Sequence, residues 1–189
     1  MDTFTCRASA LRVTSPLVNS EPVVANSANN PCVSESAQAA NATVLGLATA
    51  NVLNAQTSTE SSGAMSNASV ADVTITLGGN TIAATLLQSS ALVKCTPGAP
   101  FHPGRPAFSS ASKIATLSVN GVSLAVTGKP NQTITLPGGV LTIVISERIK
   151  QSDRITERAL RVSSGPLMTN VVVAESIADV SGNPCAPPA

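Results

Sequence analysis

The sequence contains no tryptophan and no tyrosine, and it has only three phenylalanines in 189 residues. This scarcity weakens the case for a carbohydrate-binding module, which usually stacks sugars on aromatic rings. Charge is also sparse: 11% of the residues are charged, against about 25% in an average soluble domain. Eleven basic and ten acidic residues give a net charge of +1. The balance argues against binding to nucleic acid or an anionic membrane, because both require clustered lysine and arginine.

Side chains for catalysis are scarce as well. His102 is the only histidine, and no Gly-x-Ser-x-Gly motif supplies a nucleophile that it could activate. A glycosidase would need a pair of carboxylates. The four candidates are better explained as solvent-facing residues of strands: Asp72, Glu147, Glu175 and Asp179. Neither Gly-Gly pair continues into a phosphate-binding loop, and no acidic loop or Cys-x-x-Cys pair suits a metal. We therefore expect no enzyme, no cofactor and no metal site.

Long hydrophobic runs are absent too, and the pattern of the first residues predicts no leader there. No segment reaches the ~18 uninterrupted apolar residues of a membrane helix, so no integral membrane segment is expected. Residues Met1 to Arg7 show neither the basic start nor the apolar stretch of a signal peptide. A mean hydropathy of +0.25, with so little charge, also argues against disorder. The composition predicts a folded protein but does not decide how the protein reaches its cellular location.

The residues that dominate are small or β-branched, which favours strands and turns. Ala71 to Leu77 alternates apolar with polar residues, Gly78-Gly79-Asn80 forms a turn, and Thr81 to Cys95 returns as the second strand of a hairpin. Asn120-Gly121 between two alternating runs predicts another hairpin. Further strands are expected in segments 5–14, 21–25, 133–136, 140–146 and 171–180. We predict an all-β fold, an antiparallel, jelly-roll-like sandwich of two sheets built of hairpins.

The sequence pattern does not decide the secondary structure of two segments. Residues 34–55 are rich in alanine and fit either a strand or a helix. Residues 147–161 carry eight charges, whose spacing fits either one short helix or a protruding hairpin. We expect one β-sandwich domain over residues 1–180 and a proline-rich tail over 181–189.

Four cysteines are widely spaced, and their even number fits disulfides formed in an oxidising compartment. They are Cys6, Cys32, Cys95 and Cys185, and two of them share the context Asn-Pro-Cys. Spacing leaves all three intrachain connectivities open. It also leaves open four free buried thiols, or covalent links between subunits.

Prolines recur at every third position between residues 97 and 106, a period that favours polyproline II. The proline segment, residues 96–109, also holds two of the three phenylalanines and the lone histidine. Its candidate interaction residues are Pro97, Pro100, Phe101, His102, Pro103, Arg105, Pro106 and Phe108. The segment is either a stiff surface loop or a contact site for another protein or subunit.

The order of several motifs is similar to that of the bacterial surface and secreted proteins of the choice-of-anchor P family. The matching stretches cover most of the chain: residues 6–13, 69–75 with Gly78-Gly79, 117–121, 130–138, 159–162 and 171–180. The resemblance implies an extracytoplasmic β-rich domain, and it implies no catalytic residues. Relatives of this kind differ in how the C-terminus is attached to the envelope. This chain departs from the pattern at both ends and in its charged segment 147–158.

The expected function is a non-enzymatic structural module outside the cytoplasm, either secreted or at the cell surface. Its expected partner is itself, in a homo-oligomer or fibre, or another surface protein, contacted through strand edges and loops. One alternative is a monomeric adhesion domain that binds a ligand or protein. Another is a spore-coat or appendage subunit made without a signal peptide. An enzyme would instead need a cleft that brings His102 together with a serine and a carboxylate.

Overall fold

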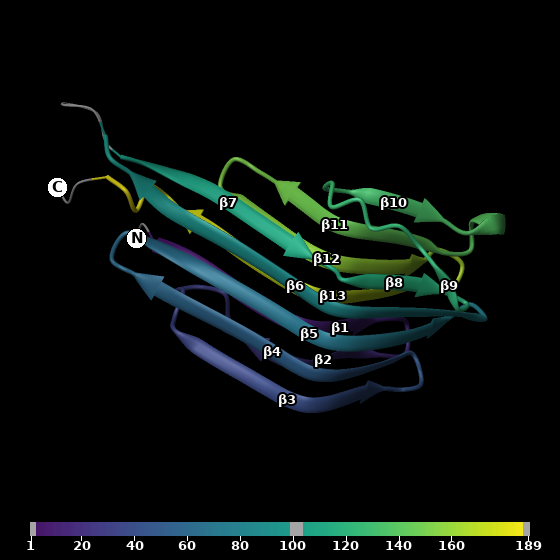
Figure 1. The fold of residues 1–189 in the computed structure, drawn as a ribbon. Helices are drawn as coiled ribbons and strands as arrows, with labels where there is room; N and C mark the ends of the chain where they lie inside the picture. Colours follow the sequence, from purple (N-terminus) through teal and green to yellow (C-terminus); the bar gives the residue numbers. More distant parts are fainter. Residues whose placement is uncertain (1–2, 99–103, 187–189) are drawn as a thin grey trace.

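The computed structural model describes residues 3–98 and 104–186. In this part of the chain two antiparallel sheets pack face to face, as Figure 1 shows, so the predicted two-sheet sandwich is confirmed. The described residues contain no α-helix and only a single 3-10 turn, Pro137–Gly139. The short helix for which the sequence left room is therefore absent from these residues.

The first sheet has six strands. Its order is β10 (Gln132–Thr135), β11 (Thr142–Lys150), β12 (Arg154–Ser164), β13 (Thr169–Ser181), β1 (Thr3–Thr14) and β2 (Asn19–Ala25). The second sheet has seven strands, ordered β3 (Glu35–Val44), β4 (Ala48–Glu60), β5 (Gly63–Leu77), β6 (Asn80–Thr96), β8 (Thr116–Val119) and β9 (Val122–Ser123). Its seventh strand, β7 (Arg105–Lys113), pairs with the other half of β6.

Both ambiguous segments are hairpins. Residues 34–55 contain β3 and most of β4, and residues 147–161 contain parts of β11 and β12, joined by a turn at Gln151–Asp153. In the second hairpin, Glu147 lies opposite Arg158 and Arg148 lies opposite Glu157. Charges of opposite sign therefore face each other across the two strands, and this arrangement stabilises a charged hairpin without a helix.

One row of residues crosses each sheet near the middle of the strands, and we call it the bend row. It consists of the positions missing from the regular pairing: Ala40, Val52, Ala71 and Leu86 in the seven-stranded sheet, and Ser146, Ala159, Ala174 and Ala10 in the six-stranded sheet. At this row the spacing between successive core-facing residues rises from two to three, as between Ala50 and Leu53. The long strands bend at mid-length (Figure 1).

The core is made of small aliphatic side chains in two clusters. The larger cluster lies between the sheets and includes Leu53, Ile75, Leu117 and Leu160. The smaller cluster surrounds Cys6 and Cys32 and takes in the half-buried Phe4 and Phe108. Many small contacts therefore replace the large rings that the sequence lacks, at about 25 cal/mol per Å² of apolar surface buried.

Hydroxyl groups connect the two sheets inside the sandwich. The Ser89 and Ser176 hydroxyls lie 2.8 Å apart, and the Ser66 hydroxyl donates to the Ile177 carbonyl at 2.8 Å. Ser66, Ser89 and Ser176 are buried, so each needs the partner that the opposite sheet supplies. These bonds fix how one sheet lies over the other.

Candidate functional site

The four cysteines form two intrachain disulfides, Cys6–Cys32 and Cys95–Cys185. No cysteine is free, so this structure holds no thiol for a covalent link between subunits. The first bond ties the segment before β3 to β1, where Asn26 donates from its side chain to the Cys6 carbonyl at 2.8 Å. The second ties the C-terminal segment to the end of β6. The expected tail therefore begins with residues that are held against the domain.

The proline segment is only partly a loop. Arg105, Pro106 and Phe108 belong to β7, where Cys95 lies opposite Pro106, so the expectation of polyproline II is wrong for these three residues. Proline has no N–H to donate, and β7 is an outer strand where that loss is tolerated. The Phe108 ring packs against the smaller apolar cluster. Pro97 is exposed, while Pro100, Phe101, His102 and Pro103 lie outside the described residues.

The outer face of the six-stranded sheet carries a network of arginines and glutamates. Glu175 is only 1% exposed; Arg12 donates to it at 2.8 Å and Arg158 at 2.5 Å. Arg158 and Arg161 each contact Glu147 at 2.7 Å. Burial lowers the pKa of Arg158, but the charge of Glu175 and hydrogen bonds to Glu147 and Glu175 outweigh burial and raise that pKa. The network holds four strands together and leaves Glu175 paired.

A second buried carboxylate, Glu157, faces the interior between β12 and β7. Its oxygens accept hydrogen bonds from the hydroxyls of Ser110 and Ser112 at 2.6 Å each, and from Arg148 Nε at 2.8 Å. Arg148 also donates to the Ser110 carbonyl at 2.9 Å. Each oxygen of Glu157 is thus bonded, and the group serves as a polar clamp that attaches β7 to the other sheet.

The four carboxylates weighed against a glycosidase pair do not all gather in one place. Glu147 and Glu175 are both paired with Arg158. Asp72 lies in β5 and accepts a hydrogen bond from Asn51 at 2.7 Å, while Asp179 lies in β13 and pairs with Arg154. Glu147, Glu175 and Asp179 are buried, so the expected solvent-facing position is wrong for these three. Within residues 3–98 and 104–186, no three histidine, cysteine or acidic side chains converge as they would to hold a metal ion. No helix in the same part of the chain is long and apolar enough to cross a membrane.

The strand edges differ in how well they are protected. An edge strand exposes unpaired N–H and C=O groups, and proteins usually guard it with proline, charge or short length. Strand β2 carries Pro22 and Glu21, and β7 carries Pro106 and terminal charges, whereas β9 and β10 are short. Strand β3 has none of these protections over the nine residues Ser36–Val44. One side of β3 pairs with β4, and no strand of residues 3–98 or 104–186 pairs with its other side.

An open groove of about 440 Å³ crosses the outer face of the seven-stranded sheet. Two cross-strand rows line it: Asn54, Ser69, Gln88 and Lys113 form one, and Gln56, Asn67, Ser90 and Ala111 form the other. The Asn54 amide donates to the Ser69 hydroxyl at 3.5 Å. Gln56, Asn67 and Gln88 make no side-chain hydrogen bond within the described residues, so their amides are available to a ligand.

No family model, curated protein or solved structure matches this chain. The resemblance to the choice-of-anchor P proteins stays a prediction. Sequence reasoning named strand edges in general but did not single out β3, because its alanine-rich pattern also fitted a helix. The absence of proline and charge over residues 36–44 is the signal that could have identified this edge. The amides of the groove come from the three strands β4, β5 and β6, and only the pairing register brings them together.

Proposed function

We propose that this protein is a non-enzymatic structural module, located outside the cytoplasm, that assembles with copies of itself through the open edge of β3. The observation that carries the proposal is the unguarded edge of β3 over the residues Ser36 to Val44. Two β3 strands that pair across a two-fold axis would join two seven-stranded sheets into one. The backbone groups supply the hydrogen bonds, so no special side chains are needed.

Two features support a site outside the cytoplasm. Both cysteine pairs are oxidised in the structure, and disulfides of this kind persist in oxidising compartments. Each disulfide secures a segment that has little strand pairing of its own, residue 32 before β3 and residue 185 after β13. The resemblance described above agrees with this location, and a spore surface or an appendage fits it as well.

The edge is tested by adding charge to it. In the variant Gln38→Lys/Ala40→Lys, two exposed β3 residues become cationic, and like charges would face each other in a β3–β3 pair. A matched control, Thr74→Lys/Thr76→Lys, places the same charges at exposed positions of β5, inside the same sheet. Light scattering should show smaller species for the β3 variant and an unchanged size for the control. An equal effect of both variants, or no effect of either, contradicts the proposal.

A second candidate function is favoured by the groove on the outer face. Its unpaired amides both donate and accept, which suits an uncharged polar chain such as an extended peptide better than a charged ligand. This is the adhesion-domain alternative. It predicts that Gln56→Ala/Gln88→Ala abolishes capture of a surface partner in a pull-down while the size of the assembly is unchanged.

A further inference from the structure

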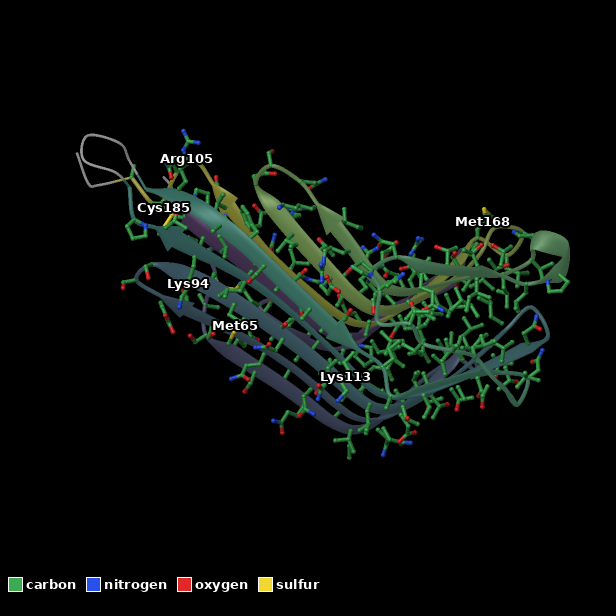
Figure 2. All side chains as sticks on the ribbon, turned by 45° about the horizontal axis from the view of Figure 1, so that its top comes forward. Met65, Lys94, Arg105, Lys113, Met168 and Cys185 are labelled. Carbon is green, nitrogen blue, oxygen red and sulfur yellow. A yellow bond between two sulfur atoms is a disulfide. The ribbon has the colours of Figure 1, made fainter. Side chains whose placement is uncertain are left out.

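The two ends of the sandwich differ sharply in charge. Six turns lie at one end, at residues 15–18, 45–47, 78–79, 120–121, 136–141 and 165–168. None of these turns, and none of the residues directly flanking them, is charged. At the opposite end every connection contains or adjoins charge, with Glu35, Glu60, Arg105 and the group Lys150, Asp153 and Arg154. Figure 2 labels Met168 at the uncharged end and Arg105 at the other.

The uncharged end also presents aliphatic side chains to solvent. The most exposed large hydrophobic residues of the described chain lie in or directly beside four of its turns: Leu17 (94%), Leu45 (75%), Met168 (72%) and Val122 (66%). Leu167 and Val140 extend the same surface. Three of the six turns come from each sheet, so both layers contribute. Single exposed aliphatic residues are ordinary in proteins, but an end surface where they gather without charge indicates an interaction site.

We infer that the uncharged end, formed by the six turns, pairs with the same end of a second copy. The charged end is a poor match, because burying its lysine, arginine and acidic groups against aliphatic tips would leave them without water or partners. An uncharged end placed against itself buries only apolar and neutral groups. The contact is therefore head to head around a two-fold axis, and it closes after two copies.

The size of the end fits such a contact. Strands lie about 4.8 Å apart and sheets about 10 Å apart. An end made of two layers, each six strands wide, therefore covers about 30 Å by about 20 Å, or about 600 Å². Stable interfaces bury about 600–1,000 Å² on each partner, so this end lies at the lower limit of that range.

A lipid surface suits this end less well. Interfacial membrane anchors combine aliphatic residues with tryptophan, tyrosine and basic residues. This chain has no tryptophan or tyrosine, and the six turns hold no lysine or arginine. Binding to a membrane is therefore the alternative that the experiment below distinguishes from pairing of two copies.

The pairing of ends does not depend on the proposed β3 contact, but the two have a joint consequence. Each contact alone would close a dimer, whereas two different two-fold contacts on one chain link copies without limit. The wild-type chain would then form open fibres. For this reason the test of the uncharged end uses the background Gln38→Lys/Ala40→Lys, in which the β3 edge is blocked.

In this background, sedimentation equilibrium should show dimers whose population rises with chain concentration. The triple variant Leu17→Glu/Leu45→Glu/Met168→Glu should weaken dimerisation at least about 100-fold, because like charges oppose each other in any two-fold register. The corresponding triple lysine variant should do the same. A mixture of the glutamate and lysine variants should restore dimers, which a purely structural defect would not allow.

The control variant Val33→Glu/Ser61→Glu/Met65→Glu adds the same charge at exposed positions away from the uncharged end, and it should dimerise normally. Three results would overturn the inference: a parent that stays monomeric at millimolar concentration, glutamate variants that still dimerise, or mixtures that stay monomeric. Co-sedimentation of the monomeric parent with phosphatidylcholine vesicles, lost in the glutamate variant, would assign the end to lipid instead. Because β3 is blocked throughout, a failure here leaves the β3 proposal standing, and the reverse is also true.

Discussion

Arg158 and Glu175 form an ion pair across β12 and β13, with Arg158 Nε 2.5 Å from Glu175 Oε2. Glu175 is almost fully buried although it lies on the outer face of its sheet, because arginine side chains cover it. Removing the partner of a buried carboxylate lowers the free energy of unfolding by far more than the intact pair raises it. The pair is therefore the point at which the charge network is most sensitive to substitution.

Replacing Arg158 with glutamine should lower the free energy of unfolding by about 3 kcal/mol, because Glu175 and Glu147 lose a shared donor. The double variant Arg158→Gln/Glu175→Gln should recover at least about 1 kcal/mol of this loss, since position 175 then carries no buried charge that needs a second arginine. Urea denaturation measures both values. A double variant that is less stable than the single one would contradict this account.

The contribution of Arg158 should not change with pH near neutrality. Its folded-state pKa is raised above the ordinary value, so the stabilisation is fully present below the unfolded pKa and is lost only as pH rises through the raised pKa. The difference in stability between wild type and Arg158→Gln should therefore be constant between about pH 6 and pH 10. Denaturation at several pH values measures it, and a difference that shrinks by pH 10 would disprove the assignment.

Peptide mapping without reductant should recover only the pairs Cys6–Cys32 and Cys95–Cys185. The second bond closes a separation of 90 residues. Chain entropy then predicts that Cys95→Ser/Cys185→Ser lowers the free energy of unfolding by about 4–5 kcal/mol. The chemical denaturation midpoint reports the loss, and detection of a Cys32–Cys185 peptide would refute the pairing.

Replacing Val52 with glycine should stabilise the protein by about 0.5–1 kcal/mol, although glycine usually weakens strands. Val52 is exposed and has a φ of 49°, a conformation that is costly for a β-branched residue. The matched control is Val122→Gly: Val122 is similarly exposed in β9 but has no positive φ, and this change should destabilise. Thermal unfolding of both variants decides the sign.

Glu157→Gln should lower the free energy of unfolding by about 2 kcal/mol, because Arg148 loses its carboxylate and one acceptor oxygen becomes a donor. The control Glu60→Gln changes an exposed residue at the end of β4 and should stay within about 0.5 kcal/mol of wild type. If both variants unfold alike, Glu157 is not the clamp described above.

The sequence predicted the turns that contain Asn-Gly or Gly-Gly, and it predicted the strands over residues 5–14, 81–95 and 171–180 although the bend row crosses each of them. It did not decide between strand and helix over residues 34–55, where the segment is rich in alanine and the alternation breaks at Val52. Strand β7 was missed because prolines at every third position concealed its pairing with β6. The cysteine pairs, the groove and the uncharged end depend on contacts distant in the chain, which no local pattern encodes.

The bend row also constrains how this chain can change in length. Adding or deleting a residue in a turn affects one hairpin. Adding or deleting a residue at Val52 alone would move the bend of β4 out of line with the bends of its neighbours β3 and β5. Insertions and deletions at the row must therefore occur in neighbouring strands together. Homologues should vary in length at the turns and keep a constant count of residues between each turn and the row.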